Sequence, residues 1–307
     1  MTVNNFDEVG AQSIVDFYFL YIDKLYENPV FKRQILNYQF EINRDISNEK
    51  DLFKNILSIY LEEAKLTLSL LNNHDFTKQM SFLEIGGGSG LVYGFLKKQG
   101  YNIYGIEPCD SGFDGYYSAA IELFKVIDVD ASNFRPFLAK DVEKLDASFD
   151  VIFSNNVFEH IPELEESIVC LKKILKVNGI MIHNTVNYFI PYEPHFQMLL
   201  LPFFPRYTEL FKPSLKKLEL WNGLNFITTH KLAKMCRTNG LKIDFMKDRL
   251  FKTFIRLDND QAFAKRQKLF VSIYRFLKST GLIKILNKIP IAFTTPITFT
   301  ITHLAKT

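Results

Sequence analysis

The sequence predicts an α/β protein whose mostly parallel sheet is covered by helices on both faces. Three observations lead to this fold class. From residue 80 onward, short apolar runs alternate with helix-length segments that end at glycine, a pattern typical of strands joined by crossover helices. The first of these runs enters a glycine-rich turn that opens a helix. The composition, 47% hydrophobic and 23% charged over 307 residues, is that of a folded chain with a large core.

Residues 1–78 are helical in pattern and are expected to form an N-terminal cap. Apolar residues recur at helical spacing between Ile14 and Tyr21 and again over residues 51–71. Asn48 stands where the longer helix needs an N-cap, with Asp51 three positions further on. We therefore expect a long helix that begins directly after Asn48.

The α/β core is expected over residues 79–250, with an insertion at 187–224 and a tail at 251–307. The insertion is rich in proline and aromatic residues, which indicates an ordered segment rather than a simple linker. The tail combines a basic helical segment with a final alternating run that predicts an edge strand. The expected strands are residues 81–85, 101–106, 136–139, 149–153, 180–186, 241–245 and 297–302, and the expected core helices are residues 91–99, 162–176 and 228–238.

Charge and cysteine content exclude several classes of protein. The formal net charge of +3 is too small to predict a nucleic-acid partner. The cysteines Cys109, Cys170 and Cys236 are far apart in the sequence, so neither a disulfide framework nor a clustered zinc site is expected. The N-terminal segment has the pattern of neither a signal peptide nor a membrane span. We expect a cytoplasmic protein.

The glycine turn at residues 86–90 is the most informative stretch of the chain. Gly86, Gly88 and Gly90 allow positive φ angles and let a ligand approach the backbone without meeting a Cβ atom. The N–H groups at the start of the following helix then face that ligand. Glu107 stands 21 residues after Gly86, at the end of the next strand, where a carboxylate accepts hydrogen bonds from ribose hydroxyls. A cofactor that carries a nucleoside is implied.

Two residues beside the turn favour S-adenosylmethionine over a dinucleotide. A dinucleotide fingerprint needs glycine at its sixth position, where the helix packs close to the pyrophosphate, and this chain has Leu91 there. Glu84, two residues before the first glycine, repels a pyrophosphate but suits an amine and a sulfonium cation. Two alternatives stay open at this point: an NAD-dependent dehydrogenase, and a glycine-rich turn that binds no ligand.

Further motifs follow the turn in a fixed order. They are the acidic strand end at Glu107, the step 140–142 after the third strand, the fourth strand with Glu159 and His160 behind it, and residues 175–179 before the fifth strand. Together they resemble the motifs of class I SAM-dependent methyltransferases, whose Rossmann-like sheet has seven strands. The resemblance implies that Glu84 and the turn glycines Gly86, Gly87, Gly88 and Gly90 line the methionine end, that Glu107 holds the ribose, that Asp141 accepts from the adenine amino group, that Val142 packs on the adenine ring and that Asn155 touches the methionine portion.

His160 is the expected catalytic residue. It follows the fourth strand, where substrate meets cofactor, and a histidine has a near-neutral pKa that suits the removal of a proton from a hydroxyl. The alternative is a histidine that only holds the loop by local hydrogen bonds. The stretch is similar to ubiquinone-pathway O-methyltransferases, in which an acidic residue three positions before the Glu-His pair is associated with a metal. This chain has Asn156 at that position, so no metal site is expected.

The acceptor side is predicted to begin where the chain leaves the fifth strand. Tyr188 and Tyr192 are suited to stack on a sugar or ring, and Glu193 and His195 are suited to bond its hydroxyls. The segment is similar to one in bacterial methyltransferases that act on saccharides or other small metabolites. The alternative is that these aromatic residues only pack the insertion.

The predicted function is methyl transfer from S-adenosylmethionine to a small acceptor, with a hydroxyl of a saccharide or a related metabolite as the target. No Asp or Glu occurs between Gln261 and Thr307, and apolar residues from Phe263 to Leu277 share one face of the predicted tail helix. Such a helix either covers a core or contacts an anionic surface, including the inner face of a membrane. A methyltransferase-like scaffold without turnover is the second alternative to the enzyme.

Overall fold

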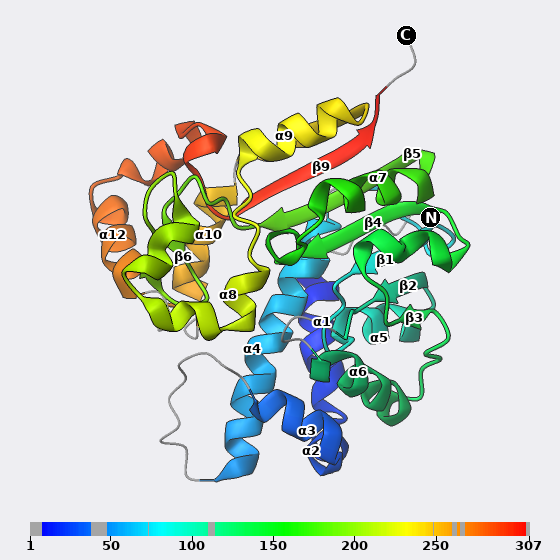
Figure 1. Ribbon diagram of the computed structural model, residues 1–307. Coiled ribbons are helices and arrows are strands. Elements are labelled where there is room, and N and C mark those ends of the chain that lie inside the picture. Colours follow the sequence, from blue (N-terminus) through cyan, green and yellow to red (C-terminus); the bar gives the residue numbers. More distant parts are fainter. Residues whose placement is uncertain are drawn as a thin grey trace.

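The computed structural model describes residues 8–37, 48–72, 74–109, 114–247, 249–259, 263–264 and 268–304. Its centre is a seven-stranded sheet with the strand order β3-β2-β1-β4-β5-β9-β8, and helices cover both faces of this sheet (Figure 1). The predicted fold class, a Rossmann-like and mostly parallel seven-stranded sheet, is confirmed.

In the described part of the chain, six strands of this sheet run in the same direction, and β9 alone runs in the opposite direction. Pairing joins β1 to β2 and β4, β2 to β3, and β4 to β5 in parallel, while β9 pairs antiparallel with both β5 and β8. The third strand lies just before the predicted range 136–139. The bounds are β1 Ser81–Ile85, β2 Asn102–Ile106, β3 Phe134–Arg135, β4 Phe149–Asn155, β5 Leu175–Thr185, β8 Leu241–Phe245 and β9 Ile297–His303.

The last strand, β9, is not an edge strand, so that prediction is wrong. It lies between β5 and β8, and β8 takes the edge. Alternation with threonine had indicated one solvated face. Instead Thr298 is buried, because its hydroxyl donates to Asn184 Oδ1 at 2.9 Å, while Phe299 and Ile301 fill the core on the other face. A buried polar pair thus gives the same alternating sequence as an exposed polar face.

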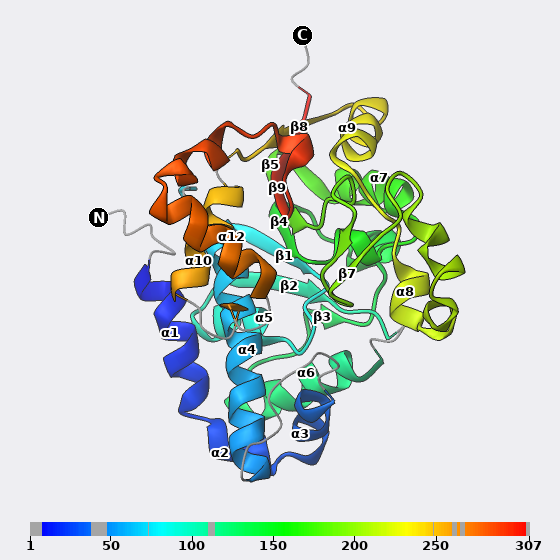
Figure 2. The same cartoon turned by 90° about the vertical axis from the view of Figure 1, so that its left-hand side faces the viewer.

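Helices cover the two faces of the sheet in two groups. On one face lie α1 to α6, and on the other lie α7 and α9 (Figures 1 and 2). The long helix α4 begins as predicted, since the Asn48 side chain accepts from the Asp51 N–H at 2.9 Å. The bounds are α1 Glu8–Phe19, α2 Ile22–Glu27, α3 Pro29–Leu36, α4 Glu49–Leu70, α5 Leu91–Lys98, α6 Asp114–Ile127, α7 Leu164–Ile174, α8 Glu219–Gly223, α9 Thr229–Thr238, α10 Arg249–Asn259 and α12 Lys268–Ser279.

Successive residues of the strands enter different cores, which is why the apolar runs of the central strands are continuous. In β4, Val151 and Phe153 face the core with α1, α4, α5 and α6, while Ile152 faces the core with α7 and α9. Tyr18 of α1 is fully buried, and its hydroxyl donates to the Leu91 carbonyl at 2.7 Å. The N-terminal helices therefore share a core with the sheet. The domain boundaries at residues 78 and 250 stay predictions.

The insertion and the tail lie side by side at one end of the sheet (Figure 1). Residues 187–224 contain the hairpin of β6 Tyr192–Glu193 and β7 Met198–Leu199, and they enclose a small core around Trp221. Among the described residues, no helix combines the length and apolarity needed to cross a bilayer. Short 3-10 helices within the described residues are η1 Ala139–Leu145, η2 Phe158–His160, η3 Pro205–Leu210, η4 Pro213–Lys217, η5 Leu282–Lys288 and η6 Ile291–Phe293.

Candidate active site

A cavity of about 290 Å³ lies at the carboxyl ends of the central parallel strands. This is the edge of an open α/β sheet at which ligands bind, because the strand-to-helix loops diverge there. Predicted site residues from four separate segments line it: Gly86, Gly88, Glu107, Asn155 and His160.

The glycine turn forms one wall of this cavity. The Gly87 N–H donates to the Ile106 carbonyl at 3.0 Å, which holds the turn against the end of β2. Gly88 has a φ of +53°, and a Cβ atom there would come no closer to the protein than 3.9 Å, at Tyr116. Its backbone is therefore open to the cavity, whereas a Cβ atom at Gly86 would lie 2.6 Å from Val157. Gly88 is the position at which a ligand can touch the main chain.

Glu107 is buried at the end of β2 and faces the cavity. Its Oε2 accepts from the Gly88 N–H at 2.7 Å, so the carboxylate and the turn form one surface. Burial raises the pKa of Glu107 to about 8. A carboxylate short of donors at a cavity wall suits a ligand that brings hydroxyl groups.

Glu84 lies beneath the turn and does not line the cavity. Its Oε2 has no hydrogen-bond partner among the described residues and would lie 3.4 Å from a Cβ atom placed on Gly87. Burial, together with the charge of Glu107, raises the pKa of Glu84 to about 8, against a backbone bond from Tyr93. Two acids that share a desolvated region favour a cationic or donor-rich ligand above them. The residues present therefore fit the sulfonium cofactor that the sequence predicts.

The two residues predicted to contact adenine, Asp141 and Val142, do not line the cavity. Asp141 bonds Lys144 at 2.6 Å, and Val142 is fully buried in the core beneath η1. The cavity wall in this region consists of the three preceding residues, Leu138, Ala139 and Lys140. The roles of Asp141 and Val142 stay predictions.

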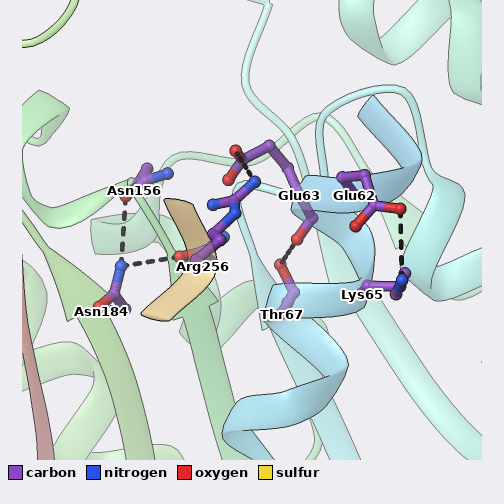
Figure 3. Close-up of polar contacts among 8 residues, drawn as sticks. Glu62, Glu63, Lys65, Thr67, Asn156, Asn184 and Arg256 are labelled. Carbon is purple, nitrogen blue, oxygen red and sulfur yellow. Dashed lines mark hydrogen bonds and ion pairs between the residues drawn. The ribbon is translucent and has the colours of Figure 1, made fainter. Parts of the chain in front are cut away.

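Asn155 ends β4, and Asn156 follows it beside the tail. The Asn184 amide donates to Asn155 Oδ1 at 2.9 Å and to Asn156 Oδ1 at 3.3 Å. Figure 3 shows Arg256 of α10 close to these residues, where its guanidinium bonds Glu63 of α4 at 3.2 Å. Sequence analysis missed Arg256 because its partner is distant in sequence. The tail and the N-terminal helices thus meet above the ends of β4 and β5.

His160 lines the cavity, and its motif partner Glu159 does not. Glu159 is fully buried and accepts from the Thr185 hydroxyl at 2.6 Å, on the side of β5. The His160 ring centroid lies 5.0 Å from that of His195. Burial, with the charge of His195, lowers the pKa of His160 to about 3, so the near-neutral pKa expected from the sequence is wrong and the His160 ring is neutral near pH 7.

The insertion brings three of the predicted acceptor residues together behind His160. Glu193 is fully buried, its Oε1 lies 2.6 Å from His195 Nδ1, and its Oε2 accepts from the Tyr188 hydroxyl. Burial lowers the pKa of His195, but the hydrogen bond and charge of Glu193 outweigh this and raise it overall. Tyr192 instead packs edge-to-face on Phe270 of α12, with ring centroids 5.7 Å apart.

Tyr116 of α6 is a cavity residue that sequence analysis did not find. Its hydroxyl lies 3.1 Å from that of Tyr60 on α4, which links the N-terminal helices to the cavity wall. No motif marks either tyrosine, since only the packing of α4 against the core brings them together. A second cavity, of about 470 Å³, lies between α7 and α9 and is lined by exposed glutamates rather than by a glycine turn and buried acids.

Comparison with known proteins identifies the family to which this site belongs. Residues 53–244 match the family described as methyltransferase domain. The chain belongs to this family. The match includes the turn, both acids and the segment behind β4, and it confirms the predicted class I SAM-dependent methyltransferase family. It gives no support to the alternative of an NAD-dependent dehydrogenase.

Relatives of this chain are similar over part of their length. A Mycobacterium tuberculosis protein without an assigned function is 28% identical over 198 residues, which are 61% of this chain and 66% of that protein. The ubiquinone biosynthesis O-methyltransferase of Pasteurella multocida is 29% identical over 110 residues, 34% of this chain and 46% of that enzyme. The chain thus spans less than two thirds of the length of these relatives.

Solved structures are similar at low identity. The Haemonchus contortus phosphoethanolamine N-methyltransferase 2, in complex with S-adenosylmethionine, has a TM-score of 0.48 at 15% identity and covers 78% of this chain and 52% of its own. The cyclopropane synthase MmaA2 of Mycobacterium tuberculosis has a TM-score of 0.46 at 15% identity. The match covers 94% of this chain and 98% of that protein.

The Glu84→Gln variant is expected to become more stable than the wild type as the pH rises. The pKa of Glu84 is about 8 in the folded protein and near 4.5 when unfolded, so folded wild type holds this proton more tightly. The stability that the wild type gains from the protonated Glu84 is complete below the pKa of Glu84 in the unfolded chain. It is lost as the pH rises through the pKa of Glu84 in the folded protein. Melting temperatures of both proteins without ligand, measured at roughly pH 5 and about pH 9, test this.

Glu166→Gln serves as the control, because Glu166 is an exposed carboxylate on α7. Its melting temperature should follow that of the wild type at both pH values. A constant difference between Glu84→Gln and the wild type across this range contradicts the electrostatic description of the turn.

Proposed function

We propose that this methyltransferase binds S-adenosylmethionine in the cavity and transfers its methyl group to a hydroxyl of a small acceptor. The observation that carries the proposal is the pairing of Glu107 with the open backbone of Gly88, above the partnerless carboxylate oxygen of Glu84. The ubiquinone biosynthesis relatives, named as O-methyltransferases, support a hydroxyl acceptor. A saccharide or related metabolite is the acceptor class that we favour.

Each end of the cavity has a proposed role in holding the cofactor. Glu107 accepts bonds from the ribose hydroxyls, and the Gly88 backbone lies against the chain that joins ribose to methionine. Glu84 and Asn155 act at the methionine end, where the positive charge of the bound cofactor favours ionisation of Glu84 beneath the turn. Bound S-adenosylmethionine supplies a methyl group that its positive sulfur has already activated. The protein then contributes mainly proximity and orientation, worth up to about 7–11 kcal/mol in well-ordered cases.

The adenine contacts are proposed for the segment after β3. Asp141 is proposed to accept from the adenine amino group through Oδ2, because Lys144 pairs with Oδ1 at 2.6 Å. Val142 supports the wall from the core, behind Ala139 and Lys140. We place the protein in the cytoplasm, because its cysteines lie far apart in the sequence and give no disulfide framework.

The acceptor hydroxyl is proposed to meet the histidine pair of His160 and His195. His160 lines the cavity with a neutral ring that can accept a hydrogen bond from the acceptor hydroxyl, and its pKa of about 3 has to rise in the complex for it to take the proton. Glu193 orients His195 through Nδ1, and Tyr188 fixes Glu193 in turn. Tyr192 and His195, which are partly exposed, are the two insertion residues that we propose to contact the acceptor.

The Gly88→Ala variant is expected to bind S-adenosylmethionine at least tenfold more weakly than the wild type, because its methyl group would enter the cavity. Gly100→Ala is the matched control. Gly100 also has a positive φ, +83°, and no atom lies within 4 Å of a Cβ atom placed there. Both variants should lose roughly 1–2 kcal/mol of stability from the left-handed backbone, and calorimetry should show a loss of affinity only for Gly88→Ala.

Absence of S-adenosylmethionine binding by the wild type would end the cofactor proposal. If the wild type and Gly88→Ala bind S-adenosylmethionine with equal affinity, the cofactor does not bind against the glycine turn. Binding without methyl transfer to any hydroxylated acceptor would favour the scaffold protein over the enzyme.

The His160→Ala variant is expected to lose roughly 10²–10⁴-fold in kcat, the contribution of a general base. Its affinity for S-adenosylmethionine should stay within a few-fold of the wild type, since the cofactor contacts lie on the turn and β2. The measurement is transfer of a radiolabelled methyl group to a panel of hydroxylated acceptors. His230→Ala, on α9 and outside both the cavity and the insertion, is the control; full turnover by His160→Ala removes His160 as the base.

The Glu193→Gln variant is expected to lower the pKa of His195. Glu193 supplies the hydrogen bond and charge that raise this pKa against burial, and an amide supplies no charge. A titration of the histidine ring signals by NMR, without any acceptor, measures the shift. The Tyr188→Phe variant should shift His195 less, because Glu193 keeps its charge. An unchanged His195 pKa in Glu193→Gln contradicts the orienting role.

A further inference from the structure

The insertion carries a group of exposed apolar side chains within one short stretch of sequence, which we call the insertion surface. The most exposed are Phe203 at 85%, Phe211 at 79% and Leu199 at 75%. Single exposed apolar residues are normal on protein surfaces, but a set within one short segment indicates a site of contact. The insertion surface consists of Leu199, Pro202, Phe203, Phe204, Tyr207, Leu210 and Phe211.

Hydrogen bonds within the insertion fix the segment that carries these outward side chains. Arg206 points inward, donates to the Trp221 carbonyl at 2.8 Å and lies 4.8 Å from the Phe226 ring centroid. The Thr208 hydroxyl accepts from the Leu201 N–H at 2.8 Å, and the Trp221 indole donates to Glu209 at 3.1 Å. The inner residues of the segment are thus committed to the small core. The outer aromatic residues have no place in it.

The backbone at Phe203 adds to this arrangement. Phe203 has a φ of +65°, a conformation that bulky residues rarely adopt and that is unfavourable by about 1–2 kcal/mol. The conformation places the ring in solvent, where it gains no burial in the free protein. Strain retained at an exposed aromatic residue is typical of a contact site.

The charges of the segment indicate the chemistry of the partner. Lys212, Lys216 and Lys217 are all exposed beside the apolar side chains, and the acids of residues 199–219 are Glu209 and Glu219. Glu209 is engaged with the Trp221 indole and lies 4.0 Å from Lys216. Aromatic rings with an excess of lysine match the interface of an anionic bilayer, into which rings insert while ammonium groups meet lipid phosphates.

The tail helix, by contrast, uses its apolar face internally. Phe270, Tyr274 and Leu277 of α12 pack against Phe254 of α10, so this face covers a core. These three side chains are therefore not available to a membrane, whereas Ile273 and Phe276 of α12 lie outside this core. A second copy of the chain is a poorer partner for the insertion surface, because the shared interface would contain two sets of the same lysines.

We propose that the insertion surface docks this protein on an anionic lipid bilayer. The β6–β7 hairpin links this surface to the acceptor side, since Tyr192 pairs with Leu199 and Glu193 pairs with Met198. One strand of the hairpin therefore carries the residue that orients His195, and the other enters the lipid. Docking holds the acceptor side of the cavity next to the bilayer, where an acceptor with an apolar tail is concentrated.

The test is sedimentation of the full chain with vesicles of phosphatidylcholine, alone or mixed with phosphatidylglycerol. The wild type should bind the mixed vesicles, and added salt should weaken this binding. Phe203→Ser with Phe211→Ser should reduce the partition coefficient roughly a hundredfold, about tenfold for each ring removed from the interface. Lys216→Gln with Lys217→Gln should reduce binding to the mixed vesicles and leave binding to phosphatidylcholine unchanged.

Phe276→Ser with Phe293→Ser is the matched control, because these rings are 61% and 55% exposed but belong to the tail. This pair should bind vesicles like the wild type. The emission of Trp221, the single tryptophan, reports in solution that each variant keeps its insertion core.

Three results would overturn the proposal. They are a wild type that does not bind mixed vesicles, an equal loss of binding in the control pair, and a dimer in solution that Phe203→Ser with Phe211→Ser dissociates. None of these measurements involves S-adenosylmethionine or methyl transfer, so their failure is distinct from failure of the proposed function.

Discussion

The site depends on two carboxylates that the fold keeps away from water. The Glu84 side chain is buried under the glycine turn, and the Glu107 side chain faces the cavity from the end of the neighbouring strand. Their side chains are close enough for the charge of Glu107 to oppose ionisation of Glu84. Such an arrangement is unfavourable without a partner of opposite charge or several donors. The cavity above the two acids therefore suits a ligand that carries a positive charge and several hydrogen-bond donors.

The cores on the two faces of the sheet hold this arrangement. The turn has to stand at the junction of β1 and α5, and the N-terminal helices fix α5 from outside through the bond of Tyr18 to the Leu91 carbonyl. The opposite core places η1 and the loop behind β4 along the other walls. The helical cap is thus a part of the site's support, which explains why α4 also contributes Tyr60 beside the cavity residue Tyr116.

The insertion joins the acceptor chemistry to the outer surface of the protein. Its buried residues orient a histidine next to His160, while its outward residues form the insertion surface. One small core around Trp221 holds both sets in place. If docking on lipid and methyl transfer occur together, they are coupled through the β6–β7 hairpin rather than through the sheet.

The sequence by itself determined the sheet, the turn and the identity of the two acids. Apolar runs and glycines are local signals, and Glu107 follows the turn at a spacing that the βαβ unit imposes. It also located Asn48 as the cap of α4 and His160 as a residue of the cavity. These features depend on residues that are near one another in the chain, so their spacing carries the information.

The tertiary structure alone decided which of the predicted polar residues face a ligand and which bond one another. Glu193 and Tyr188 are joined within the insertion, and Thr298 is buried against Asn184, which puts β9 inside the sheet. Arg256 meets Glu63 only because the tail crosses to α4. The sequence does not show whether a polar side chain forms its hydrogen bonds with water, with a ligand or with another side chain. Packing between distant segments makes that choice, since burial without a partner is too unfavourable to persist.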